Sequence, residues 1–207
     1  MNAGSTMERV YLDLKTRIME GRYPPGTRLD PLHLAPSLRA SATPVREALH
    51  RLAGERIIDS WHQEGFRPSL LAEADLHDLY SWAAAVLILA LKGQEPSPEL
   101  PSALVGLAAP GSYADGLESL FRAIAMRSDN REIRFAILSL VERSHIFRAA
   151  EARVDATARE MLGAMVADYR FGRWSALRAK ITRFHRRRMA LAGRVAAELR
   201  PRDEPLR

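Results

Sequence analysis

Cysteine is absent from the 207 residues of this chain. Its absence excludes disulfide bonds, zinc sites built on thiolates and a cysteine nucleophile, and it fits a reducing compartment such as the cytoplasm. Long apolar runs are missing too. The longest, residues 82–91, reaches about half of the roughly 20 residues that a membrane span needs, so it predicts a buried helix. Residues 1–6 are polar and lack the layout of a signal peptide. We therefore expect a cytoplasmic protein that uses no membrane.

Motifs that carry catalysis are also missing. The sequence contains no G-x-S-x-G, no phosphate-binding loop and no G-x-G-x-x-G. No two histidines have the i, i+4 spacing of metal ligands on one helix, so each is expected to be exposed or hydrogen-bonded. The histidines are His33, His50, His62, His77, His145 and His185. Nothing in these patterns predicts an enzyme.

What the chain does contain is apolar residues and positive charge. Apolar residues make up 47% of the sequence, which is enough for a core, and the formal net charge is +6. The length allows one large domain or two small ones. A basic balance suits a polyanion such as DNA, but a merely basic protein has the same composition.

Three short helices are predicted at the N-terminal end. Apolar residues at helical spacing predict the first over Met7–Glu20. Asp30 can cap a second, over Asp30–Arg39, with Pro31 at its first position. Ser41 or Thr43 can cap a third.

A hairpin should follow these helices. Residues 57–61 and 66–70 have strand composition and flank a short turn in which Gly65 can take a positive φ. Three helices and a hairpin in this order predict a winged helix-turn-helix.

The remainder, residues 72–200, is predicted to be an all-α antiparallel bundle. Gly172 is a plausible end of one helix. The predicted helices are Ala72–Lys92, Ser112–Ser128, Asn130–Ala149, Ala152–Phe171 and Trp174–Leu199.

One stretch identifies a family. Residues 43–49 read T-P-V-R-E-A-L, with Pro25-Gly26, Leu34-Ala35 and Gly65 at matching places. Residues 7–71 thus resemble the DNA-binding domain of the GntR family of bacterial transcription regulators. The resemblance implies a homodimer on a double-stranded, inverted-repeat operator whose half-sites lie about one helical turn apart.

The resemblance also implies DNA contacts. Arg46 is the first candidate, because an arginine in the first turns of a recognition helix can bind guanine through two hydrogen bonds; a surface ion pair with Glu47 or Glu20 is the alternative. Further candidates for phosphate or groove contacts are Ser41, Thr43, Arg39 and His50 on the helix-turn-helix, and His62, Gly65 and Arg67 on the wing.

Three positions depart from the family pattern. Ala42 stands where relatives have a second arginine, and Arg56 stands where they have a glycine. Arg56 must either adopt a left-handed conformation or change the turn. Glu64 at the wing tip would repel phosphate, which disfavours insertion of the wing into a groove.

Residues 72–200 resemble in size and position the sensor domain of the FadR-like branch. Many members of that branch bind a metal through an aspartate and three histidines. Here the matching positions carry Glu118, Arg122, Leu162 and Phe184, with His185 one residue off. No metal or other cofactor is therefore expected.

Arg122, Glu118, Tyr80 and His185 are candidates for a pocket that binds an organic-acid or acyl effector. Arg122 and Glu118 can instead form a structural i, i+4 pair. A degenerate sensor that only dimerises, and a helical enzyme with an accessory winged domain, remain alternatives. The run Arg183–Arg188 can attract nucleic acid, but we expect it to form a solvated face.

Overall fold

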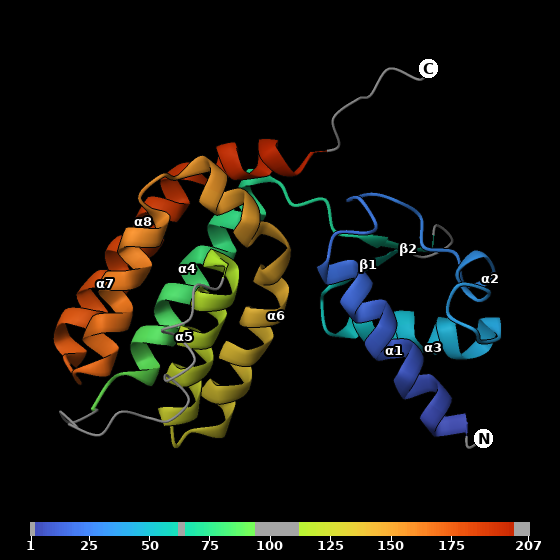
Figure 1. Ribbon diagram of the computed structural model, residues 1–207, viewed down its shortest axis with the longest axis horizontal. Helices are drawn as coiled ribbons and strands as arrows, with labels where there is room; N and C mark the ends of the chain where they lie inside the picture. Colours follow the sequence, from blue (N-terminus) through green and yellow to red (C-terminus); the bar gives the residue numbers. More distant parts are fainter. Residues whose placement is uncertain (1–2, 62–64, 94–111, 201–207) are drawn as a thin grey trace. The chain divides into compact units, whose positions relative to one another are not determined.

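The computed structural model describes residues 3–61, 65–93 and 112–200. The chain divides into two compact units, of which the first comprises Met1–Leu70 with Leu199–Arg207 and the second Leu71–Glu198. The first contains α1 (Ala3–Met19), α2 (Pro31–Leu34), α3 (Ala42–Gly54), β1 (Ile58–Trp61) and β2 (Gly65–Pro68). This order of three helices and a two-stranded sheet confirms the predicted winged helix-turn-helix (Figure 1).

Local signals set the ends of the short helices. The Asp30 side chain accepts a hydrogen bond of 2.8 Å from the Leu32 amide, and Pro31 occupies the first turn of α2, as predicted. The α-helix ends at Leu34, earlier than the predicted Arg39, because the following residues form turns that close at Arg39 with φ 48°.

The hairpin is antiparallel, with Asp59 opposite Arg67 and Ser60 opposite Phe66. Gly65 begins β2 with φ 86°, the positive value that the sequence predicted. Arg56 has φ 58°, so this non-glycine residue adopts the left-handed conformation where relatives have a glycine.

The core of the first unit lies between α1 and α3. Val10, Leu14 and Ile18 on α1 and Val45, Leu49 and Leu52 on α3 are all at most 1% exposed. The inward direction predicted for the α3 residues is confirmed.

The second unit is a bundle of α4 (Glu73–Ala90), α5 (Tyr113–Arg127), α6 (Arg131–Val154), α7 (Ala158–Arg170) and α8 (Trp174–Leu199). Ser112 and Asp115 form a capping box at α5, and the Asn130 side chain caps α6. Gly172 takes φ 62° after α7, as predicted.

Two predictions for this unit are wrong in detail. The helix predicted over Ala152–Phe171 begins only at Ala158, because α6 continues to Val154 and Asp155 interrupts the chain. The Asp155 carboxylate binds the Thr157 amide at 3.0 Å, which satisfies the start of the next segment. The apolar run at residues 82–91 is helical but only partly buried, since Trp82 and Leu89 are 52% and 51% exposed. Within the described ranges, no helix is long and apolar enough to cross a membrane.

Candidate DNA-binding surface and the core of the helical unit

One face of α3 carries the predicted DNA contacts. Thr43, Arg46 and His50 are exposed, at i, i+3 and i+7, opposite the buried face formed by Val45 and Leu49. Ser41 precedes the helix in the extended N-cap conformation, but its side chain makes no capping hydrogen bond. The hydroxyls of Ser41 and Thr43 therefore form no hydrogen bond with the helix end, and each can donate one to an acceptor outside the chain, such as a phosphate oxygen.

Arg46 is free to bind a partner. It forms no ion pair with any of the residues that the structure describes. Glu20, one of its two expected partners, instead forms an ion pair of 2.7 Å with Arg22. The alternative of a surface pair for Arg46 therefore gains no support. Holding a guanidinium free on the first turns of a recognition helix favours contact with a base edge.

Two arginines of α1 hold the turn between α2 and α3. Arg9 donates hydrogen bonds to the carbonyls of Leu38 and Arg39 at 3.0 and 3.1 Å. Arg17 donates to the Ser37 carbonyl at 3.1 Å and is itself fixed by Asp13 at 2.7 Å. These contacts hold the backbone beside the left-handed Arg39, whose side chain is exposed. Neither arginine was predicted from the sequence as a contact of this turn, although their i, i+8 spacing places them on one face of α1.

The C-terminal end of α3 is tied to α1 by a second cluster. Tyr11 donates a hydrogen bond to Glu55 at 2.8 Å, and Lys15 forms an ion pair with the same carboxylate at 3.1 Å. Burial opposes ionisation of Glu55, but these bonds outweigh it and lower its pKa. The guanidinium of Arg51 lies 3.6 Å from the centre of the Tyr11 ring. The orientation of α3 is thus fixed at both ends by α1.

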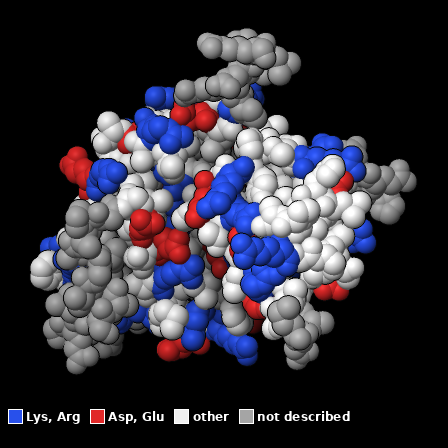
Figure 2. Space-filling view, turned by 45° about the vertical axis from the view of Figure 1, so that its right-hand side comes forward, with Lys and Arg blue, Asp and Glu red and all other residues white. Residues whose placement is uncertain are grey.

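An aromatic pair joins α3 to the second strand of the wing. The His50 ring meets Phe66 edge-on, with 4.9 Å between ring centres. His50 therefore connects the recognition helix to β2, in addition to any contact with DNA. Arg67 lies on β2 next to Phe66, whereas His62 and Glu64 lie outside the described residues. Figure 2 shows basic side chains in several separate clusters with acidic ones between them, so the net charge alone does not locate a DNA surface.

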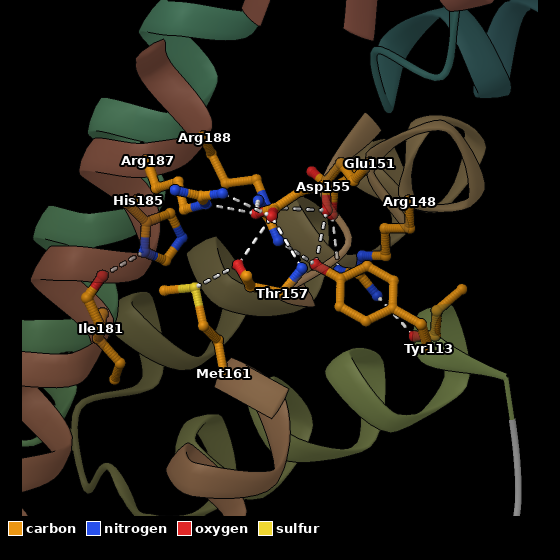
Figure 3. Close-up of polar contacts among 12 residues, drawn as sticks. Tyr113, Arg148, Glu151, Asp155, Thr157, Met161, Ile181, His185, Arg187 and Arg188 are labelled. Carbon is orange, nitrogen blue, oxygen red and sulfur yellow. Dashed lines mark hydrogen bonds and ion pairs between the residues drawn. The ribbon is translucent and has the colours of Figure 1, made fainter. Parts of the chain in front are cut away.

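The helical unit contains an internal network of charges. Arg188 on α8 donates to Asp155 at 2.6 Å and to the Tyr113 hydroxyl at 3.0 Å, and its Nε lies 3.5 Å from Glu151 (Figure 3). Tyr113 in turn donates to Glu151 at 3.0 Å, and Arg187 binds Asp155 through two bonds. We call Tyr113, Glu151, Asp155 and Arg188 the buried network; Arg187, whose side chain is 47% exposed, binds it from outside at Asp155.

A second buried arginine lies beside this network. Arg148 is 1% exposed and donates to the Ser144 hydroxyl at 2.7 Å. It also lies 3.9 Å from Glu118, a carboxylate that additionally contacts His145 at 3.3 Å. The hydrogen bond with His145, aided by Arg122, lowers the pKa of Glu118 to about 2.

The four candidate effector residues do not gather in one pocket. Tyr80 and His185 line a cavity of about 20 Å³ in the bundle core, which holds about one water molecule. Glu118 and Arg122 do not line it; they form an i, i+4 ion pair of 2.8 Å, with 41% of the Arg122 side chain exposed. Burial lowers the pKa of His185 to about 4, and its Nδ1 lies 2.9 Å from the Ile181 carbonyl.

The residues present do not fit the metal that the FadR-like resemblance would imply. Arg122, Leu162 and Phe184 offer no metal-binding atoms at the matched positions. Within the described part of the chain, no three histidine, aspartate or glutamate side chains lie close enough to share an ion. The buried carboxylates of Glu151 and Asp155 are instead paired with the guanidinium of Arg188.

Sequence comparison identifies the N-terminal unit. The sequence model of the bacterial regulatory proteins of the gntR family matches residues 6–67. The Nta operon transcriptional regulator of Aminobacter aminovorans is 40% identical over 60 residues, 29% of each chain. The uncharacterized HTH-type transcriptional regulator YdhC of Bacillus subtilis (strain 168) is 31% identical over 70 residues, 34% of this chain and 31% of YdhC. The matched region thus spans under a third of these relatives.

Solved structures share the fold over most of the chain. A putative transcriptional regulator GntR from Rhodococcus sp. RHA1 superposes with a TM-score of 0.71 at 19% identity, over 91% of this chain and 97% of that one. E. coli McbR/YncC superposes with a TM-score of 0.62 at 20% identity and the same coverage. Over residues 6–67, the N-terminal unit is therefore similar in sequence to the gntR family of bacterial regulatory proteins.

Proposed function

We propose that the chain is a bacterial transcription regulator that works in the cytoplasm and binds an operator through α3 and the wing. The observation that carries the proposal is the exposed face of α3, where Arg46 has no polar partner among the described residues and the turn before it is held by Arg9. In this role Arg46 binds a base edge, and Arg67 contacts the sugar–phosphate backbone of the DNA. Phosphate groups are bound by Ser41, Thr43 and Arg39.

We also propose that it acts as a homodimer on an inverted repeat. Support comes from α4, whose residues are apolar around most of the helix while Trp82 and Leu89 remain half exposed. A helix of this composition is normally covered on all sides. A two-fold contact between α4 helices would cover these side chains and pair two recognition helices with two half-sites.

The helical unit is proposed to belong to the FadR-like branch, but its core argues against an effector at that branch's usual site. The cavity of about 20 Å³ admits no organic acid, because the side chains of Arg148, Phe121 and Phe147 line and narrow it. This favours the second candidate function, in which the core serves only dimerisation. A catalytic role gains no support either, because Glu151, Asp155 and His185 are buried and a substrate would not reach them.

Selection of bound sequences from a random DNA pool tests the proposal directly. The wild-type chain should enrich an inverted repeat, whereas Arg46→Ala should lose the sequence preference and keep its fold. One lost bidentate contact corresponds to about 1–3 kcal/mol of discrimination per half-site. Arg22→Ala is the matched control, because Arg22 is exposed in the same unit but bound to Glu20. A folded Arg46→Ala variant that enriches the same repeat equally well would contradict the assignment.

A further inference from the structure

A groove of about 310 Å³ runs between α7 and α8. Its floor is formed by Met161, Ala164 and Met165, of which Met165 is buried and the other two are half-buried. This volume lies at the lower end of the range for small-molecule sites and is far above the 20 Å³ of the core cavity. Methionine side chains adapt readily to apolar ligands of different shape. The groove therefore fits a small apolar molecule that the core does not admit.

The edges of the groove favour a negative group at its α8 side. Lys180 is already bound to Asp168 and to the Ala164 carbonyl. Arg183 is exposed and has no hydrogen bond or ion pair with any residue in the described ranges. Glu160 lines the α7 edge and repels an anion there, so a ligand carboxylate would be directed to Arg183.

We propose that this groove binds an apolar carboxylate, with its chain on Met161, Ala164 and Met165 and its carboxylate on Arg183. The role of this ligand as an effector rests on the proposed function, but its binding does not. The FadR-like resemblance would place a ligand in the core of the bundle. The groove between α7 and α8 lies outside that core.

A physical route connects the groove to the buried network. Thr157 lines the groove, and its hydroxyl lies 3.7 Å from Met161 Sδ (Figure 3). The same hydroxyl donates to Asp155 at 2.7 Å, and Asp155 accepts the bonds of Arg187 and Arg188. A ligand that displaces Met161 thus acts two contacts away from the junction of α6, α7 and α8.

Methionine-methyl NMR on the full chain, titrated with octanoate below micelle-forming concentration, tests the site. The signals of Met161 and Met165 should shift saturably, while that of Met126, which is 65% exposed on α5, should not. Octanol should bind about threefold to tenfold more weakly, because it lacks the charge that pairs with Arg183. Equal shifts at Met126, or no saturable shift at the groove methionines, would overturn the proposal.

Variants separate the charge from the apolar floor. Arg183→Gln should weaken octanoate binding by about threefold to tenfold and leave octanol binding unchanged. Arg186→Gln is the matched control, since Arg186 is exposed on the same helix and does not line the groove. Ala164→Trp should fill the groove and abolish binding of both probes in a protein that keeps its helical circular dichroism. Unchanged octanoate binding by Arg183→Gln or Ala164→Trp would overturn the assignment.

The regulatory part has its own readout. Octanoate should change the affinity of the wild-type chain for the selected operator. Arg187→Gln, which removes a partner of Asp155 and does not line the groove, should bind octanoate but lose this change. Saturable binding without an effect on DNA affinity would overturn the effector role alone. Failure to select any operator would overturn the proposed function and leave the groove as a ligand site.

Discussion

Replacement of Arg188 by methionine should reveal how much the buried network contributes to stability. The substitution keeps most of the side-chain volume but removes the bonds to Asp155 and Tyr113 and the ion pair with Glu151. The substitution leaves Glu151 without its paired cation, whereas Asp155 keeps its two bonds to Arg187. Removing one partner of a buried ion pair in this way costs about 3–5 kcal/mol. For a unit of this size the loss corresponds to a fall in melting temperature of roughly 10–20 °C.

Urea denaturation followed by circular dichroism measures the loss. Arg186→Met serves as the control and should change the free energy of unfolding by less than about 0.5 kcal/mol, because Arg186 is exposed on the same helix. The double variant Arg188→Met with Glu151→Gln should recover part of the loss, since it no longer buries an unpaired carboxylate. That recovery separates an electrostatic role from simple packing.

The effect of pH has a definite sign. Burial raises the pKa of Glu151, while Arg188 opposes this rise. Without Arg188 the pKa of Glu151 should rise further. Above that pKa the variant must bury an unpaired carboxylate, which destabilises it, whereas below that pKa the carboxyl group is neutral and this cost disappears. The deficit in unfolding free energy of Arg188→Met should therefore shrink as pH falls through that pKa. A loss below about 1 kcal/mol, or strictly additive effects in the double variant, would refute the argument.

Three further predictions concern other contacts. Arg9→Ala removes the hydrogen bonds that hold the turn at Arg39, so it should lower the free energy of unfolding in urea by about 1–2 kcal/mol. In gel shifts it should weaken DNA binding for all sequences alike, and a sequence-selective loss would contradict this. Since the pKa of Glu118 is lowered to about 2, its stabilisation should be present above its unfolded pKa and disappear as pH falls toward 2. Thermal melts of Glu118→Gln should show a flatter acid profile, and an unchanged profile would exclude the carboxylate. Trp82→Glu with Leu89→Glu should shift the chain from dimer to monomer in sedimentation, and a persistent dimer would move the interface elsewhere.

Local chemistry made the N-terminal unit predictable. Asp30 followed by Pro31 signals a helix start within a few residues, and Gly65 marks a tight turn without any distant partner. The face of α3 followed from the spacing of its apolar residues alone. Residues 43–49 then connected this local pattern to a family whose fold the comparisons confirm.

Long-range contacts decided what the sequence could not predict. The break between α6 and α7 depends on Asp155, whose main partners, Arg187 and Arg188, lie 32 and 33 residues away. The run Arg183–Arg188 was expected to be a solvated face, and Arg183 and Arg186 are exposed, but Arg188 is fully buried. Charged side chains are so rarely buried that composition gives no hint of such a position.

The two buried arginines change what the helical unit needs in order to fold. Glu151 and Asp155 are both at most 3% exposed, and Arg188 contacts each of them, with Arg148 nearby. These cations belong to the chain itself, and they oppose the buried carboxylates where α5, α6 and α8 meet. A cavity of water size then leaves no room for a ligand to alter that balance from within. The groove between α7 and α8 meets the edge of the buried network at Thr157 and Asp155, so a ligand bound there would act on this charge balance from outside the core.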